Sequence, residues 1–584
     1  MSIADKDFLP WVKLSSDRLE KELLAKQQFV PADKAHYPLQ LNIKKVSKTV
    51  TDEVKERVRK FIPGKVFFPL DVDSSLTKSQ QAVCLKVLQM YRSERDFNNL
   101  TKIEQENLDV YKKLHSVILE EHAKFSEYVK KDWQKKSDRL ENMKNRLFAY
   151  TKTLWEKKLE KVIRYPSHYK LHDTICLAYE DPDNHIQVCM QENVHNSGTS
   201  KTVILPTLTS KCILSFRNLP SIENYELNSQ MPVVSQDGNI VDLLKTNNVD
   251  VVLSMSALKR LMDDSNPHCF WNIPVIVRKH KVVLPDGNEQ FKKFVFLDKA
   301  LPMQYPTKFE FSEKCHKELV RTNFSRVFTN SEESNKLNQN VVYNIWNISF
   351  NDKENVLMKT KKLNRKINFL LRQKIDGFES LADGKTRPVV LLPKVEYQLE
   401  HGANIATKTE LVKQWTDLLF RPFSHLYRVR LQGNTSEVVD VESVSLQKIN
   451  SEAMHHHQYK PFERLGALFT VFTKLLDLEC GNYMLHHNER TGAFAEVLIE
   501  CINTEQNIKL DLTKAYDSNS CCVKVHKNRA WCPIDVNYIL PAHATFKRMP
   551  GMFKPAVVVY NNKKGVKKKK KGKKRLKPTT GKFP

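Results

Sequence analysis

Residues Pro388–Phe420 read PVVLLPKVEYQLEHGANIATKTELVKQWTDLLF, and this stretch decides the fold class. It begins with an extended apolar run, Pro388–Tyr397, which is typical of a buried β-strand. The segment Thr407-Lys-Thr-Glu410 then has the Thr-x-x-Glu spacing of a helix capping box. A helix ending at Phe420 is therefore predicted soon after a strand, and we expect an α+β fold.

A long helical segment is predicted upstream of this stretch. Residues Leu70–Tyr165 contain neither glycine nor proline, the two strongest helix breakers. One helix is expected over Ser75–Arg95, and a second begins at the capping box Thr101-Lys-Ile-Glu104 and extends to about Arg164. Apolar residues recur in the second helix at spacings of three, four or seven. This apolar stripe favours either a hairpin packed on the body or a coiled-coil seam for another subunit.

The remaining composition shifts divide the chain into five parts. Short β-rich runs follow Pro166, and Pro285-Asp-Gly-Asn288 has the composition of a hairpin turn. The predicted parts are a mixed N-terminal segment (1–69), a long helical hairpin or coiled-coil-like region (70–165), a β-rich α+β region (166–387), a C-terminal α+β domain (388–556) and a disordered polylysine tail (557–584).

The charge is concentrated in the tail. The chain of 584 residues has a formal net charge of +27, and Asn561–Pro584 contains many lysines but no aspartate or glutamate. Such a run is typical of a nuclear localisation signal, and non-specific nucleic-acid contact is a compatible second role. A merely solubilising tail is the alternative. The residues of the predicted signal are Lys563, Lys564, Lys567, Lys568, Lys569, Lys570, Lys571, Lys573, Lys574, Arg575 and Lys577.

Several enzyme motifs begin in the sequence but are not completed. Gly384-Lys385-Thr386 ends like a phosphate-binding loop, but Glu379 replaces the first glycine and Pro388 follows closely. Asp181, Asp183 and Glu192 have the spacing of a calcium loop without its central glycine. His487-Asn-Glu489 begins like a zinc deaminase signature that lacks its cysteines, and a β-turn explains it better. We therefore expect no catalytic residues and no cofactor.

No metal site or membrane segment is expected either. The eleven cysteines contain no C-x-x-C spacing, which favours reduced thiols. His455-His456-His457 favours a solvated loop over a metal site, and Cys521, Cys522 and Cys532 near His526 favour buried thiols over zinc. The most apolar stretch, Leu465–Leu478, is too short to span a membrane.

The C-terminal landmarks resemble a known family, that of the conserved C-terminal domain of little elongation complex subunit 2. The first matching stretch is Leu391–Phe420, with an L-P-K-x-E-Y-Q strand, a Gly-Ala turn and a helix that carries E-L-x-x-x-W-T. The other matching landmarks are Trp271–Val275, Phe296–Pro302, Trp531–Asp535, Tyr538–Pro541, His543, Arg548 and Phe553–Pro555.

This resemblance implies a non-catalytic scaffold subunit that supports RNA polymerase II transcription of small nuclear RNA genes. The implied partners are little elongation complex subunit 1, an ELL-type elongation factor and the RNA polymerase II machinery. The implied location is the nucleus, in Cajal bodies or histone locus bodies. Tyr397, Trp415 and Trp531 are candidate partner-binding residues, although aromatic landmarks are also typical of a core. A nucleic-acid-binding protein that uses its basic surface and tail is the alternative, and an enzyme of unrecognised type is a third possibility.

Overall fold

The fold is described from a computed structural model of the chain. The described residues are 72–93, 97–136, 145–178, 186–197, 201–206, 208, 210–219, 231–263, 270–283, 287–303, 306, 308–327, 340–350, 366–381, 386–501, 507–516 and 531–556. The N-terminal segment 1–69, the tail 557–584, Cys521, Cys522 and His526 lie outside these ranges.

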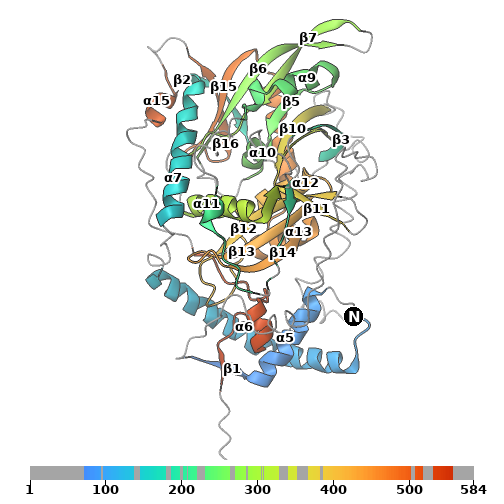
Figure 1. Cartoon of the computed structure of the whole chain (residues 1–584), viewed down its shortest axis with the longest axis vertical. Coiled ribbons are helices and arrows are strands. Elements are labelled where there is room, and N and C mark those ends of the chain that lie inside the picture. Colours follow the sequence, from blue (N-terminus) through green and yellow to red (C-terminus); the bar gives the residue numbers. More distant parts are fainter. Residues whose placement is uncertain are drawn as a thin grey trace, which may run out of the picture.

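A large mixed sheet forms the upper half of the molecule in Figure 1. In the described chain it has ten strands, and β5 pairs in parallel with β7 and β10 while the other neighbours are antiparallel. In spatial order the strands are β17 (Leu510–Asp511), β2 (His168–Cys176), β16 (Phe494–Glu500), β15 (Gly481–His487), β6 (Trp271–Val283), β7 (Glu289–Leu297), β5 (Val251–Ser254), β10 (Ile367–Ile375), β9 (Asn340–Phe350) and β3 (Ile186–Ser197).

A smaller sheet lies below the large one, and the chain passes directly between them. Asp376 is the single residue between β10 of the large sheet and β11 of the small sheet. The described strands of the small sheet, in spatial order, are β14 (Val438–Val444), β13 (His425–Gln432), β12 (Thr386–Glu396), β11 (Gly377–Ser380), β4 (Lys201–Val203) and β8 (Ser325–Val327).

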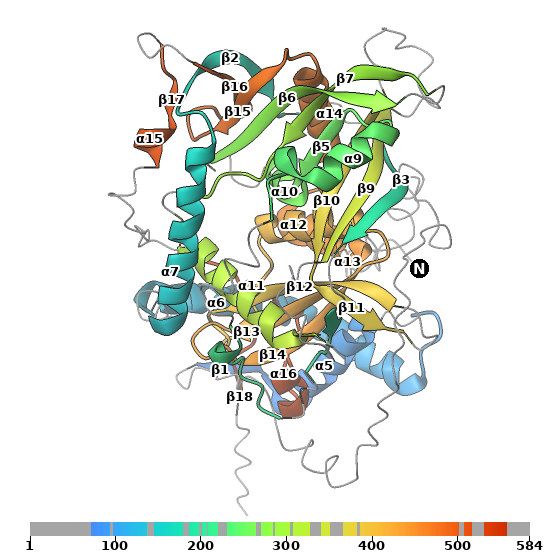
Figure 2. The ribbon, with the colours of Figure 1, turned by 45° about the horizontal axis from the view of Figure 1, so that its top comes forward.

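Helices fill the space between the two sheets. Figure 2 shows α10 and α12 in this position, and the main core joins them to both sheets. Trp415 of α12 lies in this core, which also contains Trp346 of β9 and Leu426 of β13. The helices of this layer are α10 (Met255–Met262), α12 (Lys408–Leu419), α13 (Leu446–His457) and α14 (Arg464–Leu476). Their apolar faces therefore hold the two sheets in one body.

Other helices cover the outer faces. Helix α9 (Gly238–Thr246) packs Ile240 and Leu244 on the large sheet, whereas α11 (Lys308–Phe324) packs Leu319 and Val320 on the small sheet. Helix α7 (Asn145–Glu160) packs against α11. The remaining short helices are η2 (Lys161–Arg164), η3 (Phe216–Asn218), η4 (Val234–Gln236), η5 (Pro461–Glu463) and α15 (Leu512–Ala515).

The N-terminal helices fold together with the C-terminal segment. Strand β1 (Asp73–Thr77) pairs in parallel with β18 (Lys554–Ala556), at the bottom of Figure 1. Helices α5 (Lys78–Arg92) and α6 (Lys102–Lys136) share a core with Ile539, Met549 and Met552, near α16 (Pro541–Phe546). Segments far apart in the sequence thus form one small layer beneath the small sheet.

The expected α+β class is confirmed, and some finer expectations are corrected. The α-helix does not reach Arg164, because α7 ends at Glu160 and the 3-10 turn η2 follows it, and the two described parts of the expected helix, α6 and α7, pack in different clusters. Each sheet contains strands that precede residue 388 and strands that follow it, so strand pairing crosses the predicted domain boundary at this residue. The domain boundaries and the coiled-coil seam stay predictions. Among the described residues, no helix is both long enough and apolar enough to cross a membrane.

Candidate functional site

Basic side chains converge where the two sheets meet. Helix α11 places Lys314, Lys317 and Arg321 at spacings of three and four, which puts them on one helical face. The opposite face is apolar and packs on the small sheet. We call the whole group the junction cluster, and its members are Lys158, Lys299, Lys314, Lys317, Arg321 and Lys374, with the carboxylates of Glu318 and Asp376.

Asp376 anchors the cluster. Its Oδ1 lies 2.5 Å from Nε of Arg321, and its Oδ2 accepts a hydrogen bond of 2.8 Å from the backbone N–H of Leu391 on β12. Burial alone would raise the pKa of Asp376, but the charges of Arg321 and Lys317 and the Leu391 N–H outweigh it and lower the pKa. The carboxylate is therefore ionised and fastens α11 to the point where the chain changes sheets.

Two lysines of the junction cluster differ from Arg321, which is paired with Asp376. Within the described residues, Lys299 and Lys317 form no ion pair. Lys314 places its Nζ 4.1 Å from the ring centroid of Trp155. Lys299 and Lys317 therefore contribute positive charge that no paired carboxylate of the described chain neutralises.

The surroundings of the lysines disfavour their charged form. Desolvation, followed by the charges of Lys158 and Lys374, lowers the pKa of Lys299 to about 7. Desolvation, with Arg321 and Arg372, lowers the pKa of Lys374 to about 8. Both residues are exposed to solvent, so a ligand can approach them from solution. Such groups can bind an anion and can exchange a proton near neutral pH.

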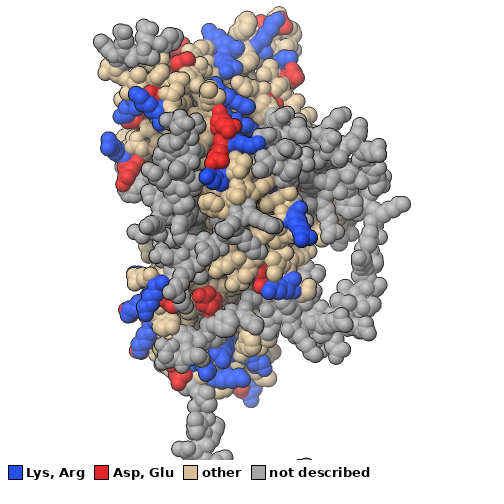
Figure 3. Space-filling view, turned by 60° about the vertical axis from the view of Figure 1, so that its left-hand side comes forward, with Lys and Arg blue, Asp and Glu red and all other residues tan. Residues whose placement is uncertain are grey.

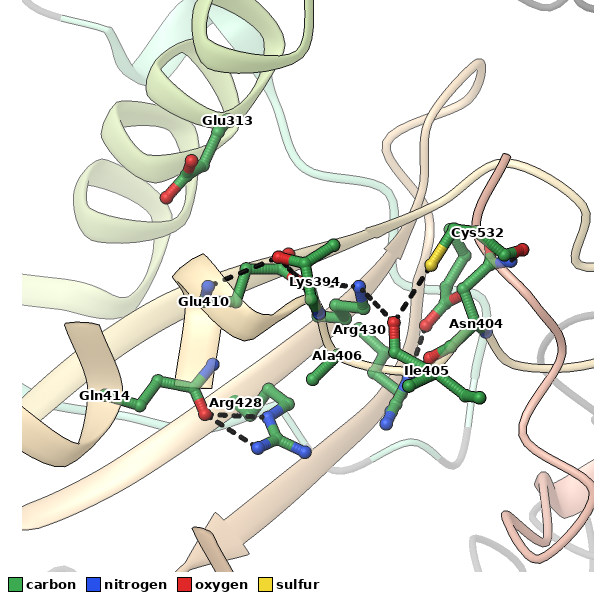
Figure 4. Close-up of polar contacts among 12 residues, drawn as sticks. Glu313, Lys394, Asn404, Ile405, Ala406, Glu410, Gln414, Arg428, Arg430 and Cys532 are labelled. Atoms are coloured by element: carbon green, nitrogen blue, oxygen red, sulfur yellow. Dashed lines mark hydrogen bonds and ion pairs between the residues drawn. The ribbon is translucent and has the colours of Figure 1, made fainter. Parts of the chain in front are cut away.

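A second charged network lies deeper in the molecule and differs in kind. In Figure 4, Lys394 of β12 contacts Glu410 of α12 at 2.8 Å, and Arg428 of β13 donates to Gln414 at 2.6 Å. Arg430 lies 2.5 Å from Glu396. Each of these buried cations has a carboxylate partner or several, so this network holds α12, β12 and β13 together and leaves no charge for a ligand.

The three aromatic residues predicted to bind a partner contact different elements. Trp415 is fully buried in the core between the sheets. The hydroxyl of Tyr397 lies 2.9 Å from Oγ of Ser312 on α11. Nζ of Lys130 on α6 lies 5.7 Å from the ring centroid of Trp531. Their role in partner binding stays a prediction.

The candidate metal residues are placed differently from the sequence expectation. His455–His457 form the last residues of helix α13 and not a loop, and His457 Nε2 lies 2.7 Å from the Ala406 carbonyl oxygen. Cys532 donates to the Ile405 carbonyl. The described residues do group Asp132, Glu400 and His401 closely enough to hold a metal ion.

Sequence reasoning missed the junction cluster. The spacing Lys314-x-x-Lys317-x-x-x-Arg321 is visible as a basic helical face, but such a face is usually solvated. Lys158, Lys299 and Lys374 come from α7, from the segment after β7 and from β10. Only the tertiary structure brings them to α11. Figure 3 also shows lysine and arginine side chains, interspersed with aspartate and glutamate, at both ends of one face of the folded body.

The fold and the cluster define an α+β protein with a basic junction between two sheets. Residues 331–555 match the family described as NMDA receptor-regulated gene protein 2 C-terminus. Little elongation complex subunit 2 of Homo sapiens is 25% identical over 170 residues, and that of Mus musculus is 26% identical over 172 residues. The resemblance to little elongation complex subunit 2 is thereby confirmed.

The extent of this similarity is limited. The match covers 29% of this chain but only 17% of the human protein and 16% of the mouse protein. It therefore concerns one region of much longer relatives, and their partners and location do not follow directly for this chain.

Among solved structures, the chain is similar to Rai1 and Dxo1. Rai1 of S. pombe is 10% identical with a TM-score of 0.38, and the match covers 56% of this chain and 99% of that chain. Dxo1 of K. lactis, in complex with manganese, is 12% identical with a TM-score of 0.28, and the match covers 58% of this chain and 94% of that chain.

These matches correct two predictions. The matched solved structures are Rai1 and Dxo1, so the prediction of a non-catalytic scaffold subunit is wrong as stated. The prediction that the chain is not an enzyme is wrong for the same reason. With TM-scores below 0.5, the similarity assigns no activity or substrate to this chain.

Proposed function

We propose that this protein binds a phosphate-bearing ligand, either a nucleotide or a phosphorylated RNA end, at the junction cluster. The observation that carries the proposal is the convergence of six cationic side chains, Lys158, Lys299, Lys314, Lys317, Arg321 and Lys374, around two carboxylates, Glu318 and Asp376.

The chemistry of the cluster fits a phosphate better than a carboxylate. A phosphate group offers several oxygen atoms in different directions, and lysines act on it as point charges from several sides. Arg321 is already held by Asp376, whereas Lys299 and Lys317 have no ion pair among the described residues. These two lysines are therefore the groups most available to the ligand.

Equilibrium binding to the full-length protein tests this proposal. The probes are ATP, a 5′-phosphorylated oligoribonucleotide and the same oligoribonucleotide with a 5′-hydroxyl. Replacing both Lys299 and Lys317 with glutamine should weaken binding at least about tenfold, because a hydrogen bond to a charged group contributes about 1.5–3 kcal/mol. Lys245→Gln is the control, since Lys245 lies on the surface of α9 and is paired with Asp242.

The three probes separate the sources of the phosphate. Binding of ATP identifies a nucleotide ligand, and preference for the 5′-phosphorylated RNA over the hydroxyl form identifies an RNA end. Equal loss of binding in Lys245→Gln, or no binding of any probe, would refute the proposal.

We further propose that the chain works in a transcription complex of the little elongation type. The support is the similarity to little elongation complex subunit 2 over one region. Subunit 1, an ELL-type factor and the RNA polymerase II machinery are the proposed partners, and the nucleus is the proposed location. The lysine run Lys563–Lys577 is the proposed import signal. Replacing these lysines with glutamine in a fluorescently tagged chain should shift it to the cytoplasm, and unchanged nuclear signal would exclude this role of the tail.

A further inference from the structure

Beyond Val277 and Val295, one face of the hairpin β6–β7 is largely uncovered by the described chain. On the covered face, Val282 and Phe294 belong to a core that also contains Ile240 and Leu244 of α9, and Figure 1 shows α9 against this hairpin. On the uncovered face, the core ends at the cross-strand pair Val277 and Val295. The hairpin therefore extends beyond its core on that side.

The uncovered face carries lysines and apolar side chains. Since alternate residues share a face, the registered pairs beyond Val277 are Lys279 with Lys293, Lys281 with Phe291, and Val283 with Glu289. Phe291 is 68% exposed and Val283 is 45% exposed. The two apolar side chains are diagonal neighbours on adjacent strands, so they form one small patch.

The charge arrangement is unfavourable for the hairpin alone. Lys279 and Lys293 are directly opposite, and like charges in that position destabilise a sheet. Lys281 pairs with Glu289, and Lys293 donates to the carbonyl oxygen of Leu478. Lys279 forms no ion pair among the described residues. The face thus retains positive charge beside exposed apolar surface.

We infer that this face, Lys279, Lys281, Val283, Phe291 and Lys293, docks an acidic peptide segment of a protein partner that carries apolar side chains. Carboxylates of the segment pair with Lys279 and Lys293, while its apolar side chains cover Phe291 and Val283. A nucleic-acid strand fits less well, because stacking platforms use successive aromatic rings and this face has one aromatic residue beside an aliphatic one.

The site is independent of the junction cluster. It lies on β6 and β7, whereas the cluster is built on α7, α11 and β10 and on the segment that follows β7. Failure of phosphate binding at the cluster would leave this inference intact, and the converse also holds.

Fluorescence anisotropy with the full-length protein tests the inference. The probe is a short labelled peptide in which aspartate and glutamate alternate with leucine and phenylalanine. Lys279→Glu and Phe291→Ala should each weaken binding about fivefold to tenfold, the effect of losing about 1 kcal/mol or slightly more. Arg278→Glu makes the same charge change on the opposite, α9-covered face of β6 and should have little effect.

The controls keep the outcomes distinct. The same peptide with asparagine and glutamine in place of its acids should not bind, and thermal unfolding of each variant should match that of the wild type. Equal weakening by Arg278→Glu would show general electrostatic attraction and overturn the inference. Binding of labelled oligouridylate, but not of the acidic peptide, with the same sensitivity to Phe291→Ala would overturn it in favour of RNA.

Discussion

Nε of Arg321 lies 2.5 Å from Oδ1 of Asp376, and this ion pair ties helix α11 to the residue at which the chain leaves the large sheet for the small one. Asp376 is 6% exposed at its side chain and Arg321 is 28% exposed. The pair therefore has a structural effect, holding the two sheets in register with α11, as well as an electrostatic effect on the neighbouring lysines.

Arg321→Gln should lower the free energy of unfolding by about 2–3 kcal/mol. The reason is that a largely buried carboxylate would lose its main counter-charge, and breaking a buried pair costs about 3–5 kcal/mol before the partial exposure of Arg321 is taken into account. Urea unfolding monitored by tryptophan fluorescence measures this change. Lys245→Gln, which breaks an exposed pair with Asp242, should cost less than about 0.5 kcal/mol. Equal effects of the two variants would contradict a structural role for Asp376.

Anion binding at the junction cluster should weaken as the pH rises from about 6 to about 9. Lys299 has a pKa of about 7 and Lys374 a pKa of about 8, so both lose their charge in this range. Sulfate is a suitable probe, because it does not titrate there. The stabilisation by sulfate, measured as the difference in melting temperature from chloride at equal ionic strength, should fall with pH.

The same lowered pKa values have the opposite pH dependence for the stability of the ligand-free protein. Because the folded pKa of each lysine lies below the ordinary value of 10.5, the unfolded chain binds more protons between about pH 7 and 10.5. The two lysines therefore make the ligand-free protein more stable as pH rises through this window.

A double replacement of Lys299 and Lys374 by arginine should retain sulfate stabilisation at pH 9. If it loses stabilisation as the wild type does, these lysines are not the titrating groups.

Substitutions in the capping box at the start of α12 test the contribution of the buried charged network to stability. Glu410 accepts hydrogen bonds from the backbone N–H of Thr407 at 2.7 Å and from Nζ of Lys394 at 2.8 Å. Glu410→Gln should destabilise the protein by about 3–5 kcal/mol, because it leaves the buried Lys394 without its counter-charge. Thr407→Ala removes only the cap and should cost about 1 kcal/mol. Chemical denaturation compares the two, and a similar cost for both would show that the ion pair contributes little.

This network also has a predicted pH dependence. Burial would raise the pKa of Glu410, but the charge and hydrogen bond of Lys394 and the Thr407 contacts lower it overall. The stability that Glu410 contributes is therefore present above about pH 4.5 and is lost as pH falls below that value. Glu410→Gln should flatten the acid limb of the stability profile.

The capping box also shows what the sequence could predict. The spacing from Thr407 to Glu410 is local, so the helix start was predictable, and the structure confirms both capping hydrogen bonds. The pairing of Glu410 with Lys394 depends on how α12 packs over β12, and no local pattern encodes that packing. For the same reason the sequence around Trp415 is compatible with either a core or an interface, and only the tertiary fold buries this side chain.

The junction cluster shows more clearly what the sequence alone cannot predict. Its basic face on α11 was visible as a spacing, but Lys158 and Lys374 are separated from it by more than one strand or helix along the chain. Their approach follows from the crossing of the chain at Asp376. A single sequence with failed enzyme motifs therefore favoured a scaffold, although it contained the residues of a charged site.

Gly551 should not tolerate a side chain. Its φ of +69° lies in the left-handed region, and a Cβ atom there would meet Cγ1 of Val536 at 2.6 Å. Gly551→Ala should therefore destabilise the packing of residues 531–556 on α5 and α6 by about 1–3 kcal/mol. Gly238→Ala is the control, because nothing lies within 4 Å of its added Cβ at the start of α9. Hydrogen exchange should show faster exchange in α5, α6 and β18 for Gly551→Ala alone. If exchange in these elements is unchanged, the C-terminal segment is not what holds the N-terminal helices on the body.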